Sequence, residues 1–144
     1  YAQMTHHEER KYLDCWCEQT TGNQDVEELQ HNWSLRLDRI TDATISPISG
    51  NWLSKLDEIQ VEMHLLHGLA FAYQAKSEDV TNEWLPDRER VRRVVRRVSS
   101  TFWFIREVLR YAPDCVIVSP ENVRQRLKDK LIAQCQNYQL EIRD

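Results

Sequence analysis

The sequence predicts an α+β protein, and three observations support that fold class. Several short segments alternate strictly between apolar and polar residues, which is typical of half-buried strands. Two segments near the C-terminus repeat apolar residues at helical spacing, and turn-forming residues separate these segments from their neighbours. A chain of 144 residues with 41% hydrophobic content can bury a core, and its length suits one domain or two small ones.

Composition argues against several classes of protein. No run approaches the roughly 18 apolar residues of a membrane helix, and residues 1–4 do not resemble a signal peptide, so we expect a cytoplasmic protein without a membrane partner. The four cysteines lack the spacing of a zinc site or of a dense disulfide framework and are interpreted as buried apolar side chains. Neither a phosphate-binding glycine loop nor a Ser-His-Asp pattern nor a metal cluster is visible. We therefore expect no catalytic residues, no metal, no cofactor and no enzymatic activity.

The first part of the chain predicts two antiparallel strands joined by a long loop. Residues 1–10 are polar and are predicted as a loop. Residues 12–18 and 33–40 alternate between apolar and polar side chains, which predicts two strands. Residues 19–31 contain turn formers and no strong period, so they are expected to connect these strands.

Alternation assigns the side chains of the two strands to opposite faces of the sheet. If Leu13 and Leu35 both face the core, the outer face collects a set of aromatic and charged side chains: Tyr12, Trp16, Arg36 and Asp38. Flat rings stack on aromatic side chains, and arginine makes bidentate contacts with phosphate or carboxylate groups. Alternatively, the two aromatic residues pack against a further strand, and Arg36 with Asp38 forms an ordinary surface ion pair.

The same alternation places Arg39 among the side chains that face inward. It is therefore either a buried charge that needs a carboxylate partner or a ligand contact at the end of the strand.

A break at Ser49-Gly50-Asn51 separates the two expected domains, residues 1–50 and residues 51–144. The second domain is predicted to contain, in chain order, a strand at 58–65, a helix at 65–76, a strand at 80–85, an element at 91–98, a helix at 101–111, a strand at 115–118 and a helix from 120. Ser99 or Ser100 is expected to cap the helix at 101–111.

Ser119 is expected to cap the last helix, with Pro120 at the first helical position. One apolar stripe of this helix is expected to face the core: Val123, Leu127, Leu131, Cys135 and Tyr138.

A dense run of arginines precedes the helix at 101–111, although the net charge of the whole chain is −4. This basic patch consists of Arg88, Arg90, Arg92, Arg93, Arg96 and Arg97, to which Arg110 is added. Only Glu89 opposes the run, so the patch could bind phosphate groups. A solvated basic strand or a dimer contact would explain it as well. The valines of residues 91–98 have helical spacing, whereas their β-branching favours a strand.

Two stretches resemble a known family. The segment Tyr12-Leu13-x-x-Trp16-Cys17-Glu18, followed by Arg36-Leu37-Asp38-Arg39-Ile40, resembles the WYL domain. The segments Thr101-Phe102-Trp103, Leu109-Arg110-Tyr111, Cys115-Val116-x-Val118-Ser119-Pro120 and Val123-Arg124 resemble the C-terminal extension that usually follows a WYL domain. The chain departs from the family pattern at Lys11, Trp33 and Leu35.

The resemblance implies a specific architecture. Residues 1–50 would form a partial Sm-like β-barrel whose first strands are missing, and residues 51–144 would form the ferredoxin-like βαββαβ extension with a C-terminal helix. It also implies that residues 91–98 form a strand.

The resemblance further implies the ligand-sensing and dimerisation module of a transcriptional regulator, behind a helix-turn-helix that would lie outside this chain. Its expected partners are a second copy of the chain and a nucleotide, an oligonucleotide or a single-stranded nucleic acid. The residues expected to bind this ligand are Tyr12, Trp16, Arg36, Asp38 and Arg39. Some members of the family act in bacterial defence, including the control of CRISPR loci. The alternative is a CRISPR-associated accessory protein that binds RNA or DNA through Arg88 to Arg97 without a DNA-binding domain.

Overall fold

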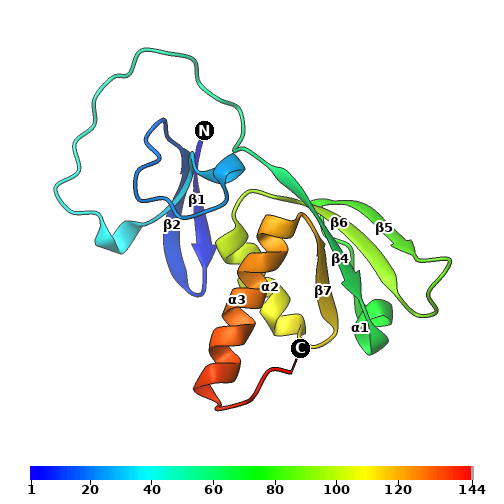
Figure 1. The fold of residues 1–144 in the computed structure, drawn as a ribbon. Coiled ribbons are helices and arrows are strands. Elements are labelled where there is room, and N and C mark those ends of the chain that lie inside the picture. Colours follow the sequence, from blue (N-terminus) through cyan, green and yellow to red (C-terminus); the bar gives the residue numbers. More distant parts are fainter. Residues whose placement is uncertain (144) are drawn as a thin grey trace. The chain divides into compact units, whose positions relative to one another are not determined.

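The computed structural model describes residues 1–143 and divides into two compact units (Figure 1). Unit 1 ends at Glu58, and unit 2 begins at Ile59. Both units combine antiparallel strands with helical segments, which confirms the α+β class. Among the described residues, none of the helices has the length and apolarity needed to cross a bilayer.

Unit 1 is built on a three-stranded antiparallel sheet in the order β1-β2-β3. Its strands are β1 (Ala2–His7), β2 (Arg10–Trp16) and β3 (Asn32–Arg36). Two single-turn 3₁₀ helices, η1 (Glu27–Leu29) and η2 (Leu37–Arg39), flank β3 along the chain. The strands at 12–18 and 33–40 that alternation predicts are therefore present, with shifted ends.

The prediction of a loop at residues 1–10 is wrong, because residues 2–7 form β1. Strands β1 and β2 make a hairpin in which His7 pairs with Arg10, so Glu8 and Glu9 alone form the turn. Both turn residues have positive φ angles, 50° and 64°. Two-residue hairpin turns of this kind favour Asn-Gly or Asp-Gly. Two glutamates give no such signal in the sequence.

The prediction that the second strand extends to Ile40 is also wrong. Strand β3 ends at Arg36, and the next three residues form η2. Alternation therefore stops at Arg36 and does not place the residues that follow. Arg39 is exposed, so it is not a buried charge.

Two asparagine side chains hold the connecting segments of unit 1 against the sheet. The amide of buried Asn32 donates to the carbonyl of Asp57 (2.8 Å) and accepts from the Asp57 backbone N–H (3.1 Å). The indole N–H of Trp16 also donates to the Asp57 carboxylate (2.9 Å). Asn23 donates to the carbonyls of Gln30 (2.8 Å) and Asn32 (2.6 Å). The return of the chain after residue 56 is thereby fixed on the sheet.

Unit 2 has the predicted βαββαβ order with one more helix at its end. Its elements are β4 (Ile59–Leu65), α1 (His67–Ala72), β5 (Asp79–Trp84), β6 (Arg92–Val98), α2 (Thr101–Tyr111), β7 (Cys115–Ser119) and α3 (Glu121–Asn137). The sheet order is β5-β6-β4-β7, and all three pairings are antiparallel. This is the ferredoxin-like arrangement, and the arginine-rich segment is a strand as the resemblance implies.

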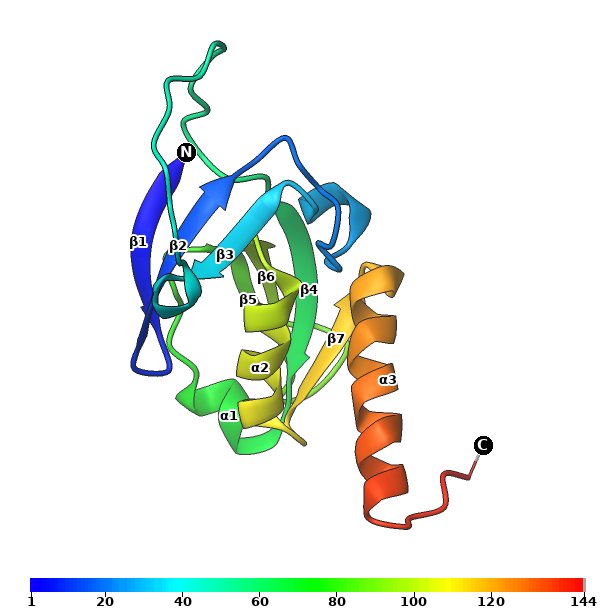
Figure 2. The ribbon, with the colours of Figure 1, turned by 90° about the vertical axis from the view of Figure 1, so that its left-hand side faces the viewer.

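Helices α2 and α3 cover one face of this sheet (Figure 2). On that side the sheet contributes fully buried Val61, Met63 and Leu65, which alternate along β4 as predicted. Ile105 and Val108 of α2 are buried as well. Of the two serines that could cap α2, Ser100 accepts the hydrogen bond, from the Trp103 backbone N–H at 3.4 Å.

Helix α3 begins one residue later than predicted. Ser119 is the last residue of β7, and Pro120 occupies the N-cap position without a side-chain capping hydrogen bond. Strand pairing of Ser119 with Glu62 takes the place of the predicted serine cap. The predicted apolar stripe is buried only in its first half. Val123 and Leu127 are buried, whereas Leu131 and Tyr138 are exposed.

A charged cluster occupies the covered side of the same sheet. The Arg96 side chain, only 6% exposed, pairs with Asp79 (Nε to Oδ1, 2.8 Å), whose side chain is 1% exposed, and with Glu107 of α2 (Nη1 to Oε2, 3.0 Å). The Tyr73 hydroxyl donates to Asp79 (2.6 Å) and accepts from Arg96. Lys76 completes the cluster through its backbone N–H to Asp79 (2.9 Å) and its ammonium group to Glu107. We call these five residues the Arg96 cluster.

Replacement of Arg96 by Met is expected to lower the free energy of unfolding by about 3 kcal/mol, because two carboxylates lose their main buried counter-charge. Urea denaturation measures the loss. The matched control is Arg97→Met, on the same strand but exposed, with an expected change within about 0.5 kcal/mol. Equal losses in the two variants would contradict the role given to the Arg96 cluster.

The carboxyl groups of the cluster have lowered pKa values. Burial alone would raise the pKa of Asp79, but hydrogen bonds from Arg96 and the Lys76 N–H outweigh burial, and the pKa lies below its ordinary 3.8. Burial is likewise outweighed at Glu107 by Lys76 and Arg96, so its pKa lies below the ordinary 4.5. Both groups are therefore easier to ionise in the folded protein than in the unfolded chain.

Stability is expected to fall at acid pH. Because the folded pKa values are lower than the unfolded ones, both carboxylates contribute fully above about pH 5, and the contribution disappears as the pH falls through the folded values. Urea denaturation at a series of pH values measures this slope, and Asp79→Asn should reduce it. A variant with the slope of the unchanged protein would refute this assignment.

Candidate functional site

The pairing of β2 with β3 brings two of the predicted ligand-binding residues together. Tyr12 lies directly opposite Arg36, and Asp14 lies opposite Ser34. These four residues share one face of the sheet, because side chains two apart on a strand point the same way. We call this surface, together with the neighbouring Thr5 and His7 of β1, the Tyr12 face.

Asp14 is the centre of a hydrogen-bond network on the Tyr12 face. Its carboxylate accepts from the hydroxyl of Thr5 on β1 (2.8 Å) and from that of Ser34 on β3 (2.6 Å). The Nε2 atom of His7 lies 3.7 Å from the same carboxylate, and the His7 ring meets the edge of the Tyr12 ring at 5.5 Å between centroids. The hydrogen bonds of Asp14 cross all three strands, and the His7 ring contacts the Tyr12 ring beside them.

Sequence reasoning did not identify this network as part of the site. Thr5 and His7 were missed because the segment that carries them was predicted as a loop. Asp14 stands on the correct face of the predicted strand, and its position in the alternation was the available signal. Its partners could be found only once β1 was known to be a strand.

Arg36 is held by a carboxylate two residues further along the chain. Its Nε and Nη2 atoms donate to the two oxygens of Asp38 at 2.8 Å and 2.7 Å. Arg10 also reaches Asp38, at 3.4 Å. The hydrogen bonds between Arg36 and Asp38 raise the pKa of the guanidinium and lower that of the carboxyl group. The ion pair considered as an alternative in the sequence is therefore present.

Arg39 contributes a further exposed positive charge at this end of the sheet. It occupies the last position of η2, and its charge helps to lower the pKa of Asp38. Arg10, Arg36 and Arg39 thus act on a single carboxylate. These three guanidinium groups could hold an anion, while the turn residues Glu8 and Glu9 add negative charge at the same end of the sheet.

Trp16 is not brought together with the Tyr12 and Arg36 pair. It lies four residues further along β2, opposite Asn32. Its ring stacks on His31 at 4.7 Å with an angle of 19° between the planes, and its N–H is used by Asp57. Both interactions belong to unit 1 itself, so Trp16 supports the local fold at the far end of the strand.

The arginines of the predicted basic patch do not lie together on one surface in the structure. Arg96 is inside the Arg96 cluster, and Arg93 pairs with Glu62 (3.0 Å) and Glu83 (3.0 Å) on the opposite face of the sheet. The hydrogen bond from Arg93 is the main reason that the pKa of Glu62 lies below its ordinary value. These two arginines are therefore engaged on different faces and do not form one surface.

The remaining arginines of the run differ from one another. Arg92 donates to the Ala70 carbonyl (2.8 Å) and to Asn82 (2.9 Å) and lies over the ring of Trp84 at 4.4 Å. Arg97 donates to the Ser77 carbonyl (3.2 Å). Three exposed arginines lie outside β6, in the β5–β6 connection and on α2: Arg88, Arg90 and Arg110.

The cysteines are free thiols. Cys15 and Cys115 are buried, as interpreted from the sequence, while the other two are partly exposed. Burial raises the pKa of both buried thiols to about 12, so they are protonated at neutral pH. In residues 1–143, no group of three or more His, Cys, Asp or Glu side chains is arranged to hold a metal ion.

Comparison with known proteins gives one family and one fold. The family model of the WCX domain matches residues 59–133, which is more than half of the chain and most of unit 2. None of the curated proteins matches the chain.

Among solved structures, proteasome accessory factor B/C (PafBC) of Arthrobacter aurescens matches with a TM-score of 0.51 and 14% sequence identity. The match covers 94% of this chain and 22% of that chain, so the present chain spans about a fifth of the length of this relative. At this identity the likeness shows the fold alone.

The domain that the WCX model matches is the C-terminal extension predicted from the segments at residues 101–124. The βαββαβ fold of unit 2 and the family match agree on the same residues. The chain therefore belongs to the WCX-domain family, which forms the C-terminal part of WYL-type regulators.

Proposed function

We propose that this module of a WYL-type regulator senses a nucleotide, an oligonucleotide or a single-stranded nucleic acid through the Tyr12 face of unit 1. The observation that carries the proposal is the direct pairing of Tyr12 with Arg36, next to the two further arginines that act on Asp38. An aromatic ring beside guanidinium groups suits a ligand that combines a base with phosphate.

Asp38 occupies the position that a ligand phosphate would take. Its carboxylate accepts a bidentate contact from Arg36 and a longer one from Arg10. Phosphate oxygens match the same fork of N–H donors. A phosphate group that replaced this carboxylate would keep the hydrogen bonds of Arg36, and Asp38 would then act as an internal competitor of the ligand.

The wider role follows from the family and from the sequence resemblance. The module is proposed to act without enzymatic activity, as a homodimer in the cytoplasm, together with a helix-turn-helix outside this chain. A CRISPR locus or another defence locus is the proposed target of regulation. The alternative of an accessory protein that grips nucleic acid through Arg88 to Arg97 has less support, because Arg93 and Arg96 are already paired with carboxylates.

Arg36→Ala is expected to weaken binding of a fluorescein-labelled single-stranded oligothymidine by about tenfold, because a charge-assisted contact to phosphate is lost. Fluorescence anisotropy measures the affinity, and thermal unfolding should show that the variant folds. The matched control is Arg124→Ala in α3, which removes the same charge from an exposed pair with Glu121. Unchanged affinity of the Arg36 variant for oligonucleotide, AMP and other nucleotides would rule out this site.

Asp38→Asn is expected to increase the affinity for the same oligonucleotide several-fold. The substitution keeps the size of the side chain but removes the negative charge that occupies Arg36 and repels phosphate. Salt titration of the anisotropy signal measures the change together with its electrostatic origin. A weaker affinity in this variant would mean that Asp38 positions Arg36 for the ligand instead of competing with it.

A further inference from the structure

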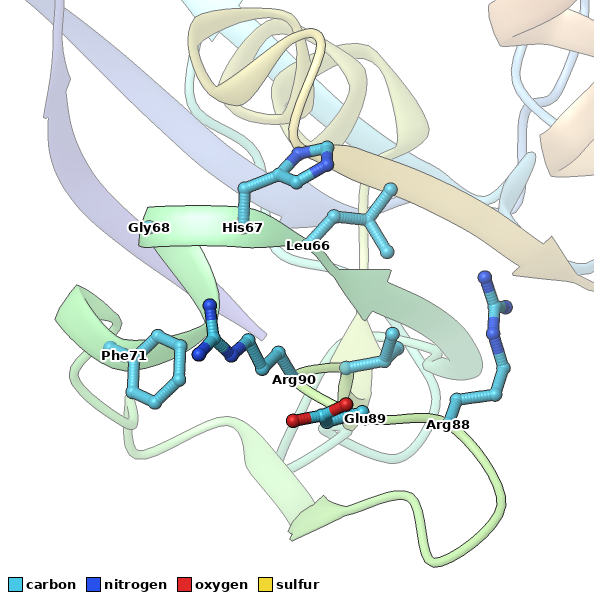
Figure 3. Close-up of a pocket in the computed structure, with 8 residues that line it drawn as sticks. Leu66, His67, Gly68, Phe71, Arg88, Glu89 and Arg90 are labelled. Carbon is cyan, nitrogen blue, oxygen red and sulfur yellow. The ribbon is translucent and has the colours of Figure 1, made fainter.

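Unit 2 contains a cavity of about 750 Å³ that the proposed function does not use (Figure 3). Two segments far apart in the sequence form it, namely the junction of β4 with α1 and the connection from β5 to β6. The lining residues are Leu66, His67, Gly68, Phe71, Arg88, Glu89, Arg90 and Val91. The volume lies within the range of roughly 300–1,000 Å³ that is usual for sites of small molecules.

Within the described residues, the two arginines of the cavity differ from the other arginines of the run in having no hydrogen-bond or ion-pair partner. In the described part of the chain, neither Arg88 nor Arg90 forms a hydrogen bond or an ion pair, whereas every arginine of β6 does. Glu89 stands between them in the sequence and forms no ion pair with either within residues 1–143. Figure 3 shows Arg90 extending towards Phe71 and Arg88 at the other end of the cavity. Both guanidinium groups are therefore available to a ligand, and Glu89 is the one acidic side chain among the lining residues.

The exposed aromatic ring of Phe71 lines the cavity. The Phe71 side chain is 60% exposed, although burial of an aromatic ring is favourable. It packs against Trp84 at 5.0 Å between ring centroids, and Arg92 lies over the other ring of this pair, at 4.4 Å from Trp84. The neighbouring residues hold the Phe71 ring at the cavity edge, and Leu66 with Val91 adds apolar surface.

The backbone at the cavity is held in an uncommon conformation on both sides. His67 and Arg90 have positive φ angles of 49° and 62°, a region that non-glycine residues seldom adopt. The His67 ring is fixed by Asp114, with 2.9 Å between Nδ1 and Oδ1. Backbone conformations of this kind persist where the surrounding structure enforces them, and they are common at ligand sites.

We propose that this cavity binds a small ring-bearing anion, with its phosphate or carboxylate group on Arg90 and its ring against Phe71, while Arg88 adds positive charge at the other end of the cavity. Guanidinium groups bind either anion in a bidentate manner. The apolar residues and the exposed aromatic ring favour a flat molecule over a free inorganic ion. The site is independent of the Tyr12 face, because every residue that forms it belongs to unit 2.

Titration of the ¹⁵N-labelled chain with four probes tests this proposal: AMP, salicylate, adenosine and inorganic phosphate. AMP or salicylate is expected to shift the backbone amide signals of Gly68 and Val91 in a saturable manner. The other two probes, which lack either the charge or the ring, should bind at least about tenfold more weakly. Tighter binding of AMP identifies a phosphate ligand, and tighter binding of salicylate identifies a carboxylate ligand.

The double variant Arg88→Gln and Arg90→Gln is expected to weaken the binding of the better probe by about tenfold or more. Arg97→Gln is the matched control, since it removes an exposed arginine of the same run outside the cavity, and Arg36→Ala should leave these shifts unchanged. The proposal is overturned if neither anion shifts the two amides at about 10 mM, which corresponds to a binding free energy weaker than about 3 kcal/mol. It is equally overturned if adenosine or phosphate binds as tightly as the better anion, or if the double variant binds like the control.

Discussion

The burial of Arg96 is the constraint on which the arrangement of unit 2 depends. A guanidinium group in the interior is strongly unfavourable unless opposite charges and hydrogen-bond acceptors surround it. Here they come from three places: Asp79 at the start of β5, Glu107 on α2, and the Tyr73 hydroxyl after α1. The strand, the helix and the connection must each lie at one position for the charge to be satisfied. The cluster thus links the positions of β5, β6, α2 and the connection after α1.

The sequence predicted the elements whose pattern is set by burial on one side. Strand β4 alternates because one face meets the helices, and α2 begins and ends at the predicted residues because a serine and a proline flank it. Prediction failed where local chemistry was unusual. The Glu8-Glu9 turn carries no glycine or asparagine, so the hairpin that contains β1 could not be recognised from the sequence. The second half of the α3 stripe looked like core, although Leu131 and Tyr138 are exposed.

The candidate site could be predicted in part, because side chains alternate regularly between the two faces of a strand. That Tyr12 and Arg36 share a face follows from alternation, whereas their direct pairing comes from the register of β2 with β3. Alternation puts Trp16 on the same face, but it does not show how far apart two residues lie along a strand or which groups already contact them. Trp16 lies four residues from Tyr12 and contacts His31 and Asp57. The arginine run shows the same limit. Spacing could not distinguish Arg96, which is buried among carboxylates, from Arg88 and Arg90, which line a cavity.

The attachment of Asp57 to Asn32 and Trp16 has a consequence for the segment of residues 40–56. Both ends of this segment are anchored, one by η2 and the other by Asp57, while nearly all of its residues are exposed. Doubling the length of a flexible loop with fixed ends costs only about 0.6 kcal/mol. Related chains can therefore differ greatly in length here without disturbing the sheet, and a tag or fluorescent reporter inserted near Ser49 would leave both units intact.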